Sequence, residues 1–169
     1  MHKVGIKKMI SKFDIKLEKI ISIFHEWIQK DIIPEHLTID VTDYKHIPDG
    51  PGIMLITHEG NISIDFENNQ VGLLYMRKQP LCKTQLENII KIKSILNFLV
   101  NELENYKDLK GKLKFKENYK IILNDRLYFP NNDSSKEILI SIIEKVFQGM
   151  KLSIINSSLN SRLTIDIQE

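Results

Sequence analysis

Short segments in which apolar and polar residues alternate follow one another between residues 37 and 75, and the turns between them strongly constrain the fold. Alternation of this kind is typical of a strand with one buried face. The turns at 59–61 and 67–70 are too short for the crossover that parallel strands need. An antiparallel meander of four strands is therefore predicted. Its apolar positions are Leu37, Ile39 and Val41, then 53–56, then Ile62, Ile64 and Phe66, and finally Val71, Leu73 and Tyr75.

Three other segments have apolar residues at helical spacing. The predicted helices cover residues 12–30, residues 82–106 and the segment from Ser134 to about 149, and short strands are predicted at 113–115, 121–123, 152–155 and 163–167. Ser11 and Asp14 are the expected capping pair of the first helix. The order α-β4-α-β2-α-β2 lacks continuous β-α-β alternation. We therefore predict a two-layer α+β fold, an antiparallel sheet with helices packed mainly on one face.

The composition narrows the class of protein. A chain of 169 residues suits one domain over residues 1–169. With 24 basic and 22 acidic residues and a net charge of +2, it lacks the basic surplus of a nucleic-acid-binding protein. The single cysteine, Cys82, excludes an internal disulfide and indicates a reducing compartment. The absence of a bilayer-spanning apolar run or secretory signal predicts a cytoplasmic protein without a membrane partner, and the Ile- and Lys-rich composition suits an AT-rich bacterial genome.

The loop from Asp43 to Gly52 holds two prolines and two glycines and is the main candidate site. Gly50 and Gly52 would let backbone amides approach a carboxylate or phosphate, with Lys45 as a further donor. The alternative interpretation is a rigid connection that holds two strands in register, because prolines fix φ. The predicted ligand-binding residues are Asp43, Lys45, His46, Asp49, Gly50, Gly52, His58, Glu59 and Arg77.

Two histidines suggest acid–base or metal chemistry, because histidine titrates near neutral pH and an adjacent carboxylate can orient it. His46 lies in the loop, and His58 is followed by Glu59 at the far end of the next strand. The strand from Ile53 to His58 spans roughly 16 Å, which argues against a shared metal ion. No metal and no cofactor is predicted, and a solvent-exposed or turn-stabilising His58–Glu59 pair stays the structural alternative.

The same loop carries a family resemblance. The run Asp43-Tyr44-x-His46-x-Pro48-x-Gly50-Pro51-Gly52-x-Met54-Leu55-Ile56-x-His58-Glu59, followed by Gly72-Leu73-Leu74-Tyr75 and Arg77-Lys78, resembles an uncharacterised family of small bacterial proteins. The resemblance is confined to residues 43–78. It implies that the loop and the His-Glu pair belong together as a signature, and it implies no activity.

Three functions follow from these observations. The leading prediction is a non-enzymatic binding module for a small anionic ligand at residues 43–52. The first alternative is a protein-interaction or chaperone-like module that forms a homodimer. Its basis is the order helix, meander, helix, hairpin, helix, which loosely resembles the topology of the small dimeric chaperones of secretion systems. A homodimer is predicted because apolar helix surface exceeds what one sheet face needs, at Phe24, Trp27, Ile92, Ile95 and Phe98. The second alternative is an enzyme that uses His46 or His58 with a nearby carboxylate.

Overall fold

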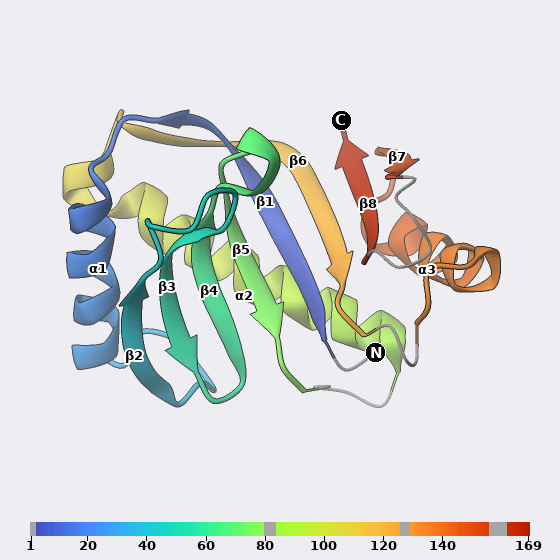
Figure 1. Cartoon of the computed structure of the whole chain (residues 1–169), viewed down its shortest axis with the longest axis horizontal. Coiled ribbons are helices and arrows are strands. Elements are labelled where there is room, and N and C mark those ends of the chain that lie inside the picture. Colours follow the sequence, from blue (N-terminus) through green and yellow to red (C-terminus); the bar gives the residue numbers. More distant parts are fainter. Residues whose placement is uncertain (1–2, 80–83, 126–128, 156–161) are drawn as a thin grey trace.

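The computed structural model describes residues 3–79, 84–125, 129–155 and 162–169 (Figure 1). Within these ranges the chain forms one antiparallel sheet of eight strands with three α-helices. The strands are β1 (Val4–Phe13), β2 (Thr38–Asp43), β3 (Pro51–Thr57), β4 (Gly60–Asp65), β5 (Gly72–Arg77), β6 (Leu113–Leu123), β7 (Lys151–Ile154) and β8 (Leu163–Gln168). The helices are α1 (Leu17–Gln29), α2 (Gln85–Asn105) and α3 (Asp133–Val146), and the 3-10 turns are η1 (Glu67–Asn69) and η2 (Lys107–Leu109). An α+β fold with an antiparallel sheet is confirmed.

The strand order is β2-β3-β4-β5-β1-β6-β8-β7, so the N-terminal strand joins the meander to the C-terminal strands. One row of apolar side chains crosses all eight strands on one face. Its members, in spatial order, are Val41, Leu55, Ile62, Tyr75, Ile6, Ile121, Ile165 and Ile154. Residues of α1 and α2 belong to the same apolar core, α3 contacts α2, and Figure 1 shows α2 running behind the sheet.

The opposite surface of the sheet, called the second face from here on, has a different composition. Because successive side chains of a strand point to opposite sides, the next row of residues lies on this face. That row reads Thr42, Met54, Ser63, Leu74, Lys7, Lys120, Asp166 and Ser153. In Figure 1 the second face lies toward the viewer, with η1 in front of it.

The beginning of the chain corrects the predicted first helix. Residues 4–13 form β1, and α1 begins only at Leu17. Ser11 therefore lies in a strand, where its hydroxyl donates to the Lys114 carbonyl at 3.0 Å, and it does not cap the helix. The alternation of this strand was hidden because Lys7 and Lys8, which read as solvent-exposed residues, are buried at 1% and 7% exposure.

The second half of the chain needs three further corrections. The strands predicted separately at 113–115 and 121–123 are one strand, β6, whose pairing with β1 shifts register between Lys8 and Lys12. The observed order is thus β-α-β4-α-β-α-β2. Helix α2 begins at Gln85 behind a capping box formed by Thr84 and Glu87. The first two residues of the predicted helix, Cys82 and Lys83, lie outside the described residues. Helix α3 ends at 146, earlier than expected.

The apolar helix surface that suggested a homodimer is largely buried within the chain. Phe24 and Trp27 are 0% and 2% exposed, and Ile92 and Ile95 are 1% and 7% exposed, with α3 packed against α2. The homodimer stays a prediction, without this support. None of the helices in the described ranges is long and apolar enough to cross a membrane.

Candidate functional site

The cation expected to bind an anion in the loop is already paired. Lys45 Nζ donates to Glu18 Oε1 of α1 at 2.9 Å and lies 3.1 Å from Asp43 Oδ2. Asp43 Oδ1 also accepts from the Lys45 backbone amide at 2.9 Å. The hydrogen bond with Glu18 raises the pKa of Lys45. These contacts link the loop to the start of α1 and satisfy the ammonium group.

The glycines of the loop are explained by close packing. A Cβ atom on Gly52 would lie 2.5 Å from a ring carbon of Phe66, so only glycine lets that ring cover the strand. The Gly50 carbonyl accepts a hydrogen bond from the Phe66 amide at 3.2 Å. The left-handed residue of the turn is Asp49, with φ of 53°. This part of the loop therefore supports the structural interpretation of the glycine pair.

The two predicted histidines lie at opposite ends of β3. His46 is exposed in the loop, with its ring centroid 6.3 Å from that of Tyr44. The His58 side chain is 62% exposed, with Nδ1 3.4 Å from Glu59 Oε1. Seven strand residues separate them, which is about 23 Å. Among the described residues, no group of three or more His, Cys, Asp and Glu side chains is placed to hold a metal ion.

Arg77 lies on the helix side of the sheet, in a buried chain of hydrogen bonds that sequence reasoning missed. Its NH1 donates to the Tyr75 hydroxyl at 3.0 Å, and that oxygen lies 2.7 Å from His36 Nε2. His36 Nδ1 lies 2.8 Å from the Pro34 carbonyl, which only accepts, so a neutral His36 carries its proton on Nδ1 and accepts from Tyr75. Burial lowers the pKa of His36, and the charge of Arg77 lowers it further.

At the same end of the sheet, Glu59 also has a structural role. Its Oε2 accepts from the Leu37 amide at 2.8 Å, and its carbonyl accepts from the Lys78 amide at 3.0 Å. These contacts tie the beginning of β2 to the end of β5. His58, Glu59 and Arg77 are therefore separated from the loop by the length of β3.

A pocket of about 230 Å³ lies on the second face beside the loop, and we call it the loop pocket. Asp49 and Gly50 line it, and they are the predicted site residues that the structure places there. The apolar part of its lining consists of Pro51, Met54, Leu74 and Met76, and further polar side chains come from Asn61, Ser63, Asp65, Glu67 and Arg162. Residues of β3, β4 and β5, with Glu67 of η1 and Arg162 just before β8, thus converge on one concave site.

Most charges around the loop pocket are paired. Lys7 Nζ lies 2.5 Å from Asp65 Oδ2, and the two side chains are 1% and 5% exposed. Arg162 forms an ion pair with Glu67. Burial lowers the pKa of Lys7, and the hydrogen bond with Asp65 opposes that shift.

Gly72 makes the pair between β1 and β4 possible. Lys7 on β1 has to cross β5 to reach Asp65, and Asp65 pairs directly with Gly72 in the sheet. A Cβ atom on Gly72 would lie 2.7 Å from Lys7 Cε. The lysine stem therefore occupies the space that a side chain would need.

One polar atom of the loop pocket has no partner. Asn61 Oδ1 is buried without a hydrogen bond. A buried acceptor without a donor costs about 1–3 kcal/mol, and a ligand that donates a hydrogen bond there would recover part of that cost. Asn61 and Arg162 carried no sequence signal, because their role depends on strands far apart in the chain.

The resemblance of residues 43–78 to an uncharacterised family stays a prediction. Comparison of the chain with protein-family models, with curated proteins and with solved structures finds no match.

Proposed function

We propose that this protein is a non-enzymatic binding module whose ligand occupies the loop pocket. The observation that carries the proposal is the buried acceptor Asn61 Oδ1, which has no hydrogen-bond partner and belongs to a pocket with an apolar floor. Binding pockets combine apolar lining with a few convergent polar groups, and Met54, Leu74 and Met76 supply the apolar part here. The ligand is accordingly a small molecule with an apolar body and a hydrogen-bond donor.

The charges favour a donor that is cationic. The acidic lining residues are Asp49, Asp65 and Glu67, against one cation, Arg162. Lys7 compensates Asp65 and Arg162 compensates Glu67, which leaves the exposed Asp49 carboxylate at the rim. A small anion, as expected from the loop sequence, would meet acceptors there, since Lys45 and Arg77 bind other groups.

Binding is favoured over catalysis by the position of the titratable groups. Both histidines of the enzyme alternative lie at the ends of β3 and neither lines the loop pocket. The buried carboxylate in the pocket, Asp65, is held by Lys7 at 2.5 Å, so it is engaged by a counter-ion of the protein. A general base has to reach the reacting group within hydrogen-bond distance.

A matched series of probes tests the proposal. Butylammonium, butanol and butyrate share one apolar body and differ in the polar group, and each is titrated into ¹⁵N-labelled protein. We expect butylammonium to shift the amide signals of Asn61, Ser63 and Met76 at lower concentration than butanol, and butyrate to have the smallest effect. Stronger binding of butyrate would establish an anion site instead. The absence of localised shifts with all three probes would overturn the pocket as a binding site.

Two variants sharpen the assignment. Asn61→Leu removes the buried acceptor, and Asp49→Asn removes the rim charge without changing its size. Asn61→Leu is expected to weaken butylammonium binding about tenfold or more, since a hydrogen bond with a charged partner contributes about 1.5–3 kcal/mol. Asp49→Asn is expected to have a smaller, several-fold effect, since an ion pair at an exposed carboxylate contributes less. His58→Ala, at the far end of β3, is the matched control and should bind as the wild type does.

A further inference from the structure

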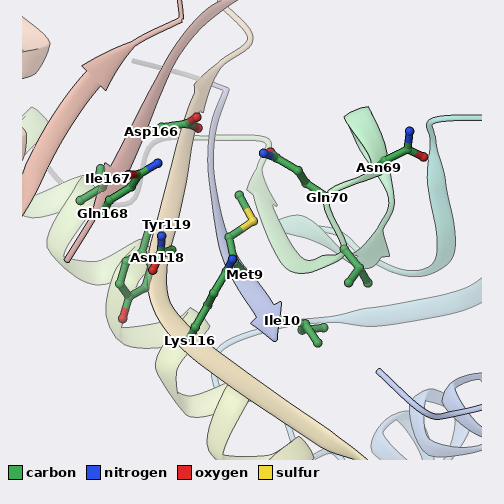
Figure 2. Close-up of a pocket in the computed structure, with 11 residues that line it drawn as sticks. Met9, Ile10, Asn69, Gln70, Lys116, Asn118, Tyr119, Asp166, Ile167 and Gln168 are labelled. Atoms are coloured by element: carbon green, nitrogen blue, oxygen red, sulfur yellow. The ribbon is translucent and has the colours of Figure 1, made fainter. Parts of the chain in front are cut away.

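A second pocket, of about 220 Å³, lies on the second face beyond η1. It shares no lining residue with the loop pocket. Figure 2 shows Gln70 and Asp166 on opposite walls, with Met9 between them and with Asn118 and Gln168 from neighbouring strands. Four parts of the chain build it: the end of η1 with the two residues after it, β1, β6 and β8. It is called the amide pocket below.

A buried lysine holds the two walls of the amide pocket together. Lys120 is 4% exposed, and its Nζ donates to Gln70 Oε1 at 2.8 Å. The same Nζ lies 3.6 Å from Asp166 Oδ1, which is an ion contact and too long for a hydrogen bond. The Lys120 ammonium group is thereby paired within the protein, and its charge balances that of Asp166.

The carboxylate of Asp166 has unused hydrogen-bonding capacity. Its Oδ1 is buried and has no hydrogen-bond partner. Side-chain amides line the same pocket, from Asn69, Gln70, Asn118 and Gln168. Each amide both donates and accepts hydrogen bonds, whereas the carboxylate only accepts. Such a set matches groups that donate and accept at the same time, as hydroxyls do.

The charge balance and the apolar lining narrow the ligand further. A phosphate or carboxylate would be repelled by the Asp166 carboxylate, and an amine would be repelled by Lys120 and Lys116. An uncharged molecule avoids both repulsions. Met9 and Val71 offer an apolar surface for the C–H face of a ring. We infer that the amide pocket binds a small uncharged polyhydroxylated molecule, of the size of a monosaccharide or a cyclitol.

The inference is independent of the loop pocket and is tested with its own probes. Glucose and myo-inositol are titrated into ¹⁵N-labelled protein to tens of millimolar, with cyclohexanol as a ring of similar size that carries one hydroxyl. We expect a polyol to shift the amide signals of Gln70, Asn118 and Gln168, and cyclohexanol to leave them unchanged. No localised shift with either polyol would overturn the inference, and so would equal shifts with cyclohexanol.

Two variants separate ligand contact from loss of fold. Gln168→Ala changes an exposed residue and should weaken the polyol about tenfold, the effect of one lost hydrogen bond of about 1.4 kcal/mol. Asp166→Asn keeps the shape, replaces an acceptor by a donor and should weaken it at least as much. Asn61→Leu, in the loop pocket, should leave polyol binding unchanged. Equal affinity in wild type, Gln168→Ala and Asp166→Asn would place the polyol elsewhere.

Discussion

The two faces of the sheet are similarly buried at their centre, but the buried side chains are apolar on one face and largely polar or charged on the other. On the helix side, Ile6 and Tyr75 are 0% exposed in a row of apolar side chains. On the second face, Lys7 and Ser63 are 1% exposed and Lys120 is 4% exposed. Burial of the first row stabilises the fold by about 25 cal/mol for each Å² of apolar surface. Burial of the second row carries a desolvation cost that paired charges offset.

The comparison teaches that a buried position in this sheet need not belong to the apolar core. Pairs such as Lys7–Asp65 contribute little net stability, because the attraction mainly offsets the loss of hydration. They do hold side chains in defined positions. Both pockets of the second face border such pairs, and each has among its lining residues one with a buried oxygen that makes no hydrogen bond, Asn61 in the loop pocket and Asp166 in the amide pocket.

The largest expected effect comes from breaking one buried pair. Asp65→Leu should lower the free energy of unfolding by about 3–5 kcal/mol, because Lys7 is left buried without a counter-charge. The double variant Lys7→Met/Asp65→Leu should recover most of that loss, since no charge remains to be hydrated. Urea denaturation of the single and double variants measures both values.

The matched control lies on the same strand but on the helix side. Ile62→Ala should cost about 2–5 kcal/mol by leaving a cavity, and the charge-removing partner Lys7→Met should not rescue it. A double variant Lys7→Met/Asp65→Leu as unstable as Asp65→Leu alone would contradict the view that the second face depends on charge compensation.

The next effect tests the path of the Lys7 side chain. Gly72→Ala should lower the free energy of unfolding by about 1–3 kcal/mol, the usual cost of overpacking, because the new Cβ would lie 2.7 Å from both Lys7 Cε and the Lys8 carbonyl oxygen. Gly111→Ala is the control, since its Cβ would meet no atom within 4 Å and only its φ of 76° is unfavourable. An equal loss of unfolding free energy in the two variants, measured by urea denaturation, would argue against the path of the Lys7 side chain across Gly72.

A smaller effect is expected from His36, whose hydrogen bonds on the helix side are those of a neutral ring, in contrast to the paired charges of the second face. The pKa of His36 is lowered by burial, so between that pKa and the ordinary value of about 6.5 the unfolded chain binds more protons than the folded one. The contribution of His36 to stability is therefore fully present above about pH 6.5, and it is lost as the pH falls through the pKa of His36 in the folded protein. His36→Gln should remove this slope, measured by urea denaturation between about pH 5 and 8. The exposed His58→Gln is the control, and a slope retained in His36→Gln would assign it to another group.

The smallest effect is expected at the sheet edge, where two large apolar side chains are exposed. Leu37, just before the edge strand β2, and Ile39 within it are 66% and 57% exposed, so Ile39→Lys should change stability by less than about 0.5 kcal/mol. The same variant tests the predicted homodimer by sedimentation. A wild-type dimer that becomes a monomer in Ile39→Lys would place the interface at β2, and an unchanged dimer would place it elsewhere.

The meander was predictable because its strands alternate in the simplest way and its turns are short. Ile62, Ile64 and Leu73 are buried as that pattern indicates. The strand β1 was not predictable, since Lys7 and Lys8 become buried only when Asp65 and Glu117 approach from other parts of the chain. Local pattern carries no information about such partners.

Some residues of the loop pocket could likewise be predicted from the sequence, and others could not. The loop sequence pointed to Asp49 and Gly50, which do line a pocket. It could not place Asn61 or Arg162 beside them, because strand order and register decide which side chains meet.

By itself, the sequence determined the alternation that makes an antiparallel sheet and the apolar row that closes one face of it, since hydrophobic periodicity is a local property. Only the tertiary structure decided that Lys7 lies across Gly72 to reach Asp65 and that two pockets lie on the second face. It also showed that Gly52, in the loop from Asp43 to Gly52, makes room for the Phe66 ring. Charge pairing and cavity shape depend on residues that are distant in sequence, so they exist only once the strands have been placed in order.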